Sequence, residues 1–175
     1  LPPLRRNSAA SIRDLACGET VTCAGFSDGS VRCWGGDGFT GLLGLGINAP
    51  VLGDDDLPSS VAAIALGGPA RTVACGSVHV CAGLEDGRVR CWGQNSVGQL
   101  GLGHNIAVGD PSGVAPVSLS GSATQLACGA FHVCVVLTEG AVQCWGRNEQ
   151  GQLGLSHRND VGDNELPSSQ PTASI

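Results

Sequence analysis

The chain has 175 residues, a length that suits one modest domain, and its formal net charge is −6. Arg5 and Arg6 form the single adjacent basic pair, and an acidic chain without a basic patch makes poor use of phosphate contacts, which argues against nucleic acid as a partner. No apolar run approaches the roughly 18 residues of a membrane span, so we expect no direct span of a membrane.

The first ten residues differ in composition from the rest of the chain. Residues 1–10 contain two prolines and two arginines, and we predict that they form a lead-in segment ahead of one repeat domain at residues 11–175. The sequence starts at Leu1 without Met and shows no signal peptide. We therefore expect a mature or trimmed piece whose targeting segment is missing.

A motif that begins with Cys-Trp-Gly occurs three times. The copies lie at residues 33–46, 91–103 and 144–156, and they share a glycine- and leucine-rich end. A period near fifty residues, together with short strand-like segments, predicts an all-β, propeller-type repeat array. In such an array each unit stacks on its neighbours to bury its apolar surface. The units are expected at approximately residues 11–60, 61–113 and 114–170.

The nine cysteines are spaced six and then ten residues apart in every unit. In the second unit, a loop at residues 85–87 with a glycine at its third position predicts a hairpin that closes on Leu84 and Arg88. That register places Cys81 opposite Cys91, at a Cα separation of roughly 4.5–5.5 Å, which is within disulfide range. The same arithmetic predicts three hairpin disulfides: Cys23–Cys33, Cys81–Cys91 and Cys134–Cys144. Such regular use of cysteine favours an oxidising compartment.

One cysteine of each unit is left over by this pairing: Cys17, Cys75 and Cys128. The simplest interpretation is a small buried apolar side chain on an inner strand. The alternative is that these three cysteines form cross-blade or intermolecular disulfides. Because the number of cysteines is odd, at least one of the nine has no partner within the chain. A second pairing, Cys75–Cys81, also fits a turn, but that turn lacks the glycine of the other hairpin.

The aromatic and histidine positions predict core roles. Trp34, Trp92 and Trp145 each follow a disulfide cysteine, so they point to the opposite side of the strand and are expected to pack between blades. Exposed rings that bind carbohydrate are the competing interpretation. His79 and His132 are expected to be neutral imidazoles that hydrogen-bond nearby backbone. We expect no metal, because convergent partners at a recognised spacing are absent from the sequence.

Residues 74–101, with the order Ala-Cys-Gly, His, Cys-Ala, Gly, Cys-Trp-Gly and Gly-Gln-Leu-Gly, resemble a repeat of the regulator of chromosome condensation family. Residues 127–155 match nearly as well, and the resemblance covers residues 11 to about 170. The chain is most similar to the cysteine-bearing subset of these repeats, which occurs in secreted bacterial and protist proteins and in the ectodomains of Crinkly-type plant receptor kinases. The resemblance implies a β-propeller, usually of seven four-stranded blades, with loops that bind partners. About three four-stranded blades in an incomplete or open ring are therefore expected. Val21 stands where the other units have histidine, so the first blade is expected to diverge.

The sequence shows no catalytic grouping, no nucleotide-binding fingerprint and no cofactor motif. We therefore predict a non-catalytic protein-binding or scaffolding segment, a component or accessory subunit of a larger extracellular or lumenal assembly. Its expected partners are other protein chains, either copies of itself or subunits of a larger complex. The alternatives are a regulator or exchange factor of a small GTPase, for which the family resemblance alone argues, and a carbohydrate-binding module.

Overall fold

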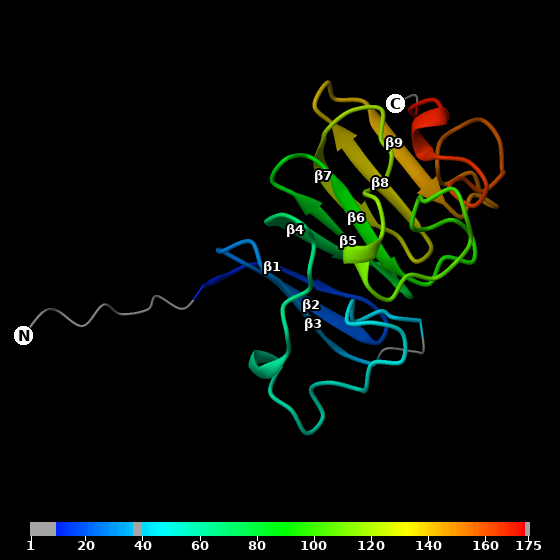
Figure 1. Cartoon of the computed structure of the whole chain (residues 1–175). Helices are drawn as coiled ribbons and strands as arrows, with labels where there is room; N and C mark the ends of the chain where they lie inside the picture. The colour runs from blue at the N-terminus through cyan, green and yellow to red at the C-terminus, as the bar shows by residue number, and fades with distance from the viewer. Residues whose placement is uncertain (1–9, 37–39, 174–175) are drawn as a thin grey trace, which may run out of the picture.

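The computed structural model describes residues 10–36 and 40–173, so the expected lead-in at residues 1–10 lies almost wholly outside the described residues. The described chain forms three antiparallel sheets of three strands each, and every sheet is built from consecutive strands. This confirms the all-β, propeller-type array (Figure 1). The strands are β1 (Ile12–Cys17), β2 (Val21–Phe26), β3 (Val31–Gly35), β4 (Ala70–Cys75), β5 (His79–Leu84), β6 (Val89–Gly93), β7 (Ala123–Cys128), β8 (His132–Leu137) and β9 (Val142–Gly146). Three short 3-10 turns follow the sheets, η1 (Pro58–Ser60), η2 (Pro111–Gly113) and η3 (Pro167–Ser169).

The hairpin between the second and third strands of each blade fixes the register of the sheet. In the second blade, the backbone N–H of Leu84 donates to the carbonyl of Arg88 at 2.8 Å, and Gly87 has a φ of 84°. A glycine adopts this left-handed conformation without the steric cost of a Cβ. The closed turn places Cys81 directly opposite Cys91, as the sequence predicts.

Each sheet has three strands, and the fourth that the resemblance implies is reduced to an extended segment beside the outer strand. Three single backbone hydrogen bonds hold these segments: Ile64 N to Val31 O at 2.9 Å, Val117 N to Val89 O at 2.8 Å, and Ala173 N to Val142 O at 2.8 Å. The expected strand is therefore present in position but not as a paired ladder.

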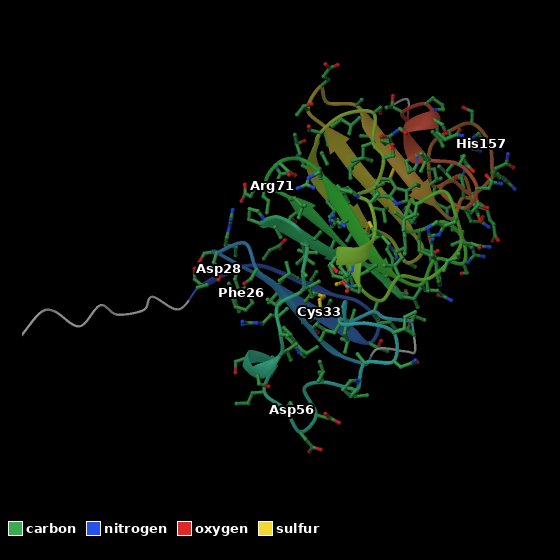
Figure 2. All side chains as sticks on the ribbon, in the orientation of Figure 1. Phe26, Asp28, Cys33, Asp56, Arg71 and His157 are labelled. Carbon is green, nitrogen blue, oxygen red and sulfur yellow. A yellow bond between two sulfur atoms is a disulfide. The ribbon has the colours of Figure 1, made fainter. Side chains whose placement is uncertain are left out.

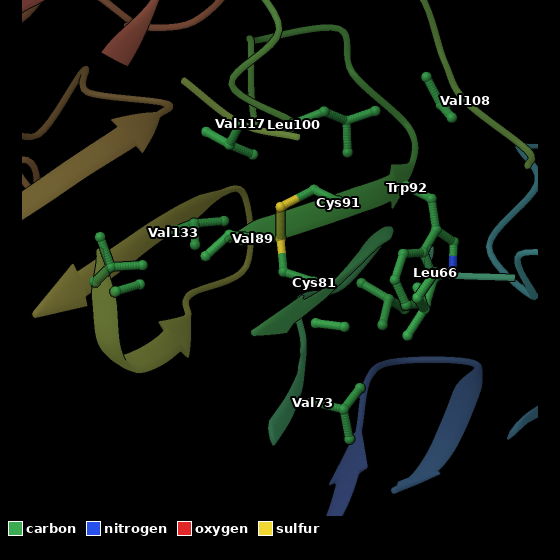
Figure 3. Packing of buried hydrophobic residues seen from close by; sticks show 14 of the residues in the cluster. Leu66, Val73, Cys81, Val89, Cys91, Trp92, Leu100, Val108, Val117 and Val133 are labelled. Atoms are coloured by element: carbon green, nitrogen blue, oxygen red, sulfur yellow. A yellow bond between two sulfur atoms is a disulfide. The ribbon is translucent and has the colours of Figure 1, made fainter. Parts of the chain in front are cut away.

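The three blades stack face to face around one continuous core. Strand β4 packs against β1 and β2, and β7 packs against β4 and β5. Buried valines and leucines from all three blades join a single cluster, with the Cys81–Cys91 disulfide and the Trp92 ring inside it (Figure 3). The core is aliphatic because the chain contains only six aromatic residues. Each blade thus depends on its neighbour to cover its apolar side.

The stack is open at both ends in the described part of the chain. The first and third blades lie at opposite ends, with the second blade between them (Figure 1). No helix in the described ranges is long and apolar enough to cross a membrane.

Candidate protein-interaction faces

Side chains alternate along each strand, so every blade has one side turned toward the preceding blade and one turned toward the following blade. In the second blade, Trp92 lies on the side that packs against the first blade. The indole Nε1 of Trp92 donates to the carbonyl oxygen of Leu42 at 3.0 Å, and the Nε1 of Trp145 donates to the carbonyl oxygen of Gln99 at 3.1 Å. Each contact therefore joins a tryptophan to the glycine-rich loop of the blade before it.

The glycine-rich loops also contact each other directly from blade to blade. The backbone N–H of Gly46 donates to the carbonyl of Gly109 at 2.9 Å, and that of Gly103 donates to the carbonyl of Gly162 at 3.0 Å. A Cβ at Gly98 would overlap the backbone of Gly162 and its neighbours. Glycine is therefore required here because two backbones approach closely.

Trp34 departs from the expected core role. Trp92 and Trp145 are fully buried, whereas Trp34 is only partly buried. The physical reason is its position on the side of the first blade that no described residue of another blade covers. This surface, the N-terminal face, comprises the partly exposed residues Thr22, Phe26, Ser30, Arg32 and Trp34.

The N-terminal face contains a hollow with a volume of about 450 Å³. Its lining includes Phe26, Trp34 and Pro58. The guanidinium of Arg32 lies 5.5 Å from the centre of the Phe26 ring, close enough for a cation–π contact. Figure 2 places Phe26 and Asp28 together at this end of the molecule. The lining of the hollow thus combines apolar side chains with the polar side chains of Asp28, Ser30 and Arg32.

The opposite end of the stack exposes the other side of a blade. His132, Cys134 and Val136 are partly exposed on the third blade, whereas His79 and Cys81, at the matching positions of the second blade, are fully buried. We call this surface the C-terminal face and include in it the loops that carry Gly140 and Gly151, together with Gln152 and Ser156 of the same glycine-rich segment. A hollow of about 470 Å³ lies here, lined in part by Phe131, His132 and Gln152.

All six cysteines of the expected hairpin pairs form disulfides, Cys23–Cys33, Cys81–Cys91 and Cys134–Cys144, each with a Cα separation of 4.1 Å. The alternative Cys75–Cys81 pairing does not occur, because Cys81 is bonded to Cys91. Cys33 is labelled in Figure 2, within the first sheet.

The remaining cysteines are free, with Cys17 exposed and both Cys75 and Cys128 partly buried against the core. Burial, with a smaller contribution from the nearby Cys17 thiol, raises the pKa of Cys75 to about 12. Burial, assisted by Cys75, also raises the pKa of Cys128. These two thiols stay protonated at neutral pH, which suits a packing role more than a reactive one.

His79 is neutral but lacks the expected hydrogen bond. Its ring stacks on Gly76, where a Cβ would overlap Cε1, and neither ring nitrogen has a hydrogen-bond partner among the described residues. Burial lowers the pKa of His79 to about 4, and the neighbouring His132 adds a smaller effect in the same direction. His132 is less buried, and burial lowers its pKa too. The neutral imidazole ring of His79 therefore serves as a packing group between blades.

His79, Cys81 and Cys128 place one potential metal-ligand atom each within 4.8 Å of one another. The sulfur of Cys81 is already bonded to Cys91, so two free donors remain. A tetrahedral metal site needs three or four protein ligands. This cluster therefore does not form a metal centre while the disulfide is intact. The acidic residues Asp54, Asp55 and Asp56 are exposed. Asp56 is labelled in Figure 2, in the loop that precedes η1.

The sequence interpretation missed the role of Asn95 and Asn148, which are fully buried. The Nδ2 of Asn95 donates to the carbonyls of His104 and Ile106 at 2.5 and 3.2 Å, while its Oδ1 accepts from Leu100 N at 2.9 Å. Asn148 makes the matching set of contacts in the third blade. The signal in the sequence was the same asparagine at the same offset from two Cys-Trp-Gly motifs.

The chain is similar to known repeat proteins. A family model described as "Regulator of chromosome condensation (RCC1) repeat" matches residues 86–136, and a second model of that description matches residues 70–99 and 123–152. The RCC1 domain-containing protein RUG3, mitochondrial, of Arabidopsis thaliana is 36% identical over 151 residues, which are 83% of this chain and 32% of that protein. The chain thus spans about a third of that relative.

Two solved structures share the fold. The crystal structure of human WBSCR16 gives a TM-score of 0.77 at 20% identity over 99% of this chain and 42% of that one. Prp20p from Saccharomyces cerevisiae, whose structure is described with its binding properties to Gsp1p and histones, gives 0.69 at 20% identity over 89% of this chain and 38% of that one. At these identities the likeness shows the fold alone.

Proposed function

Because the chain belongs to the regulator of chromosome condensation (RCC1) repeat family, we propose that it is a non-catalytic protein-binding or scaffolding segment of a β-propeller. It acts as a component or accessory subunit of a larger extracellular or lumenal assembly. Its partners are other protein chains, and the N-terminal face is a binding surface.

The N-terminal face is the observation that carries this proposal. Trp34 and Phe26 are partly exposed in an apolar hollow, while the tryptophans at the matching positions of the next two blades are fully buried. An apolar surface that includes a partly exposed tryptophan is typical of a protein-interaction site. The fold therefore offers a surface that another protein would cover.

The three disulfides support the oxidising compartment. Disulfides persist outside the cytosol, where glutathione and thioredoxin do not reduce them. The mitochondrial location in the name of RUG3 argues for a different compartment for that relative. Mass spectrometry of protein alkylated without reduction would test the assignment, and three free thiols with six cysteines in disulfides is the expected result. Nine alkylated thiols in protein from its native source would overturn it.

A photo-cross-linking amino acid at position 26, introduced in the native host, tests the binding surface. The expected result is covalent adducts at position 26 that are absent when the same probe replaces Asp86, which lies on the exposed turn between β5 and β6 of the second blade. Equal labelling at both positions, or no adducts at position 26, would count against the N-terminal face as a binding site.

The alternatives have their own tests. The description of Prp20p names Gsp1p, so a nucleotide-release assay with a small GTPase examines the exchange-factor alternative. The partial exposure of Trp34 beside Phe26 favours a sugar-binding alternative, because sugars stack on aromatic rings. Quenching of Trp34 fluorescence by a panel of glycans, absent in Trp34→Phe, would support that alternative over protein binding.

A further inference from the structure

Metal-ligating side chains of the second and third blades meet inside the stack. One ring nitrogen of His79, the sulfur of Cys81 and the sulfur of Cys128 lie within 4.8 Å of one another. We propose that these three residues, together with Cys91, bind one zinc ion once the disulfide between Cys81 and Cys91 is reduced. The inference concerns the junction between two blades and does not depend on the proposed protein-binding function.

The strands of two blades position the four ligands. His79 and Cys81 are two residues apart on β5, so their side chains point to the same side of the sheet. Trp92 packs toward the first blade, so the adjacent Cys91 points toward the third. Cys128 ends β7, which packs against β5. The ligands therefore come from three strands, and no short sequence motif with recognised spacing contains them.

His79 is the residue whose surroundings point to a ligand. Its side chain is fully buried, and both ring nitrogens lack a hydrogen-bond partner within residues 10–36 and 40–173. A buried polar atom without a partner loses its contacts with water and gains nothing in exchange. Coordination of a metal ion by one ring nitrogen would give this imidazole the partner that it lacks in the oxidised chain.

The spacing of the donors suits zinc. Three cysteines and one histidine form an established tetrahedral zinc set, with Zn–S distances of about 2.3 Å and Zn–N distances of about 2.0–2.1 Å. These lengths place two sulfur ligands about 3.8 Å apart, so donors that now lie within 4.8 Å of one another need to approach by about 1 Å at most. Side-chain rotation is sufficient for a change of this size.

The disulfide controls whether the site exists. A dithiol reductant supplies two electrons and two protons: the bond between Cys81 and Cys91 breaks, two thiols form, and the reductant becomes a disulfide. Zinc then displaces the thiol protons, including that of Cys128, which burial keeps protonated in the metal-free chain. The site therefore belongs to the reduced chain, the state that precedes disulfide formation.

A hollow of about 340 Å³ gives an ion access to this junction. Its lining includes Cys75, Gly76, Cys128 and Gly129, at the ends of the inner strands. Cys128 is partly exposed, whereas His79 is fully buried. An ion that enters the hollow would therefore meet the Cys128 sulfur before the other ligands.

The junction between the first and second blades provides a natural control. A Cβ at Gly18 would lie 3.0 Å from Cγ1 of Val21, and one at Gly76 would lie 2.5 Å from Nδ1 of His79, so the valine takes the place of the imidazole. The sulfur positions are repeated at this junction by Cys23, Cys33 and Cys75. Because it lacks the nitrogen donor, we expect this junction to bind zinc far more weakly.

Cys91→Ala tests the site without any reductant, because it frees the Cys81 thiol and leaves the two other disulfides to hold the fold. Cobalt(II) is the probe, since a tetrahedral cobalt ion with thiolate ligands absorbs strongly in the visible region. The variant should bind one cobalt per chain with this absorption, with water in the fourth position, and added zinc should remove the absorption by displacement. Cys33→Ala, the matched change in the first blade, should not show it.

Further changes in the Cys91→Ala chain separate the ligands from their neighbours. His79→Val and Cys128→Ala should each weaken zinc binding by about 100-fold or more, because changes to groups that merely orient a ligand already cost 10- to 100-fold. Cys75→Ala removes another thiol of the same hollow and should leave the zinc affinity unchanged. Equal losses in Cys75→Ala and Cys128→Ala would assign the metal to the thiols of the hollow and overturn the proposed ligand set.

Tetrahedral cobalt absorption of equal strength in Cys33→Ala, or its absence in Cys91→Ala, would also overturn the proposal. If Cys91→Ala does not fold, the unchanged chain is reduced with a phosphine, which offers no competing thiol. Zinc should then raise the melting temperature of the reduced chain, and His79→Val should abolish this rise; no rise, or an equal rise in both chains, would remove the inference. None of these outcomes changes the cross-linking result at position 26, so the proposed function is tested separately.

Discussion

The indole Nε1 of Trp92 donates a hydrogen bond of 3.0 Å to the carbonyl oxygen of Leu42, fifty residues earlier in the chain. The ring is fully buried between the second and first blades. Trp145 repeats the relationship with Gln99. The tryptophan of each Cys-Trp-Gly motif therefore joins two blades through both apolar packing and one backbone contact, and it does not serve its own sheet alone.

Replacement of Trp92 by alanine should destabilise the fold far more than the same change at Trp34. A fully buried tryptophan that is truncated to alanine costs about 3–5 kcal/mol in the free energy of unfolding. Trp34 is partly exposed on the N-terminal face, so its loss should cost less. Urea denaturation under dilute conditions measures both variants. Equal losses at the two positions would contradict the difference in burial.

The sequence specifies each blade well because its determinants are local. The three-residue loops with a terminal glycine fix the hairpin register, and that register follows from counting residues outward from the turn. The pairing of Cys81 with Cys91 then follows from position alone. Similarly, strand alternation places Trp92 on the side opposite the disulfide, which the structure shows.

The features that the sequence left open depend on neighbouring blades. The exposure of Trp34 follows from what lies beside the first blade, and no local pattern encodes that. The missing hydrogen bonds of His79 depend on the close approach of Gly76 and of the third blade. The fourth strand that the resemblance implies is reduced to one backbone hydrogen bond each from Ile64, Val117 and Ala173, and the repeat pattern does not encode how far such a segment pairs.

Asn95→Ala should destabilise the glycine-rich loop of the second blade. The asparagine side chain bonds two part-buried carbonyls and the buried N–H of Leu100, and a buried backbone group left without a partner costs about 1–3 kcal/mol. Amide hydrogen exchange should show faster exchange at Leu100, whose N–H loses its acceptor. Ser96→Ala, at an exposed position of the same loop, is the matched control. Unchanged protection at Leu100 would exclude this role for the asparagine.

Joint replacement of Cys81 and Cys91 by alanine should lower the free energy of unfolding by about 2–3 kcal/mol, because the disulfide closes a short loop and restricts the unfolded chain. Alanine at Cys75 serves as the control, since that thiol is free and only partly buried. Guanidinium denaturation without reductant measures both variants. Addition of reductant should remove most of the difference between the unchanged chain and the double variant, and a persistent difference would point to packing instead of the cross-link.

Stability should fall as the pH is lowered from about 6.5 to about 4, and His79 should account for much of the fall. The unfolded chain binds a proton at this histidine with the ordinary pKa of 6.5, whereas burial holds the folded pKa at about 4. The unfolded state therefore takes up more protons across this window, and the free energy of unfolding decreases by up to about 3 kcal/mol at 1.36 kcal/mol per pH unit. Below a pH of about 4 this histidine is protonated in both states, and the loss of stability is complete.

His79→Val installs the residue found at position 21 of the first blade and should flatten the dependence of stability on pH. His132→Val should flatten it less because that ring is less buried. Denaturation midpoints across this pH range give the comparison, and an unchanged slope in His79→Val would show that other groups govern the acid limb.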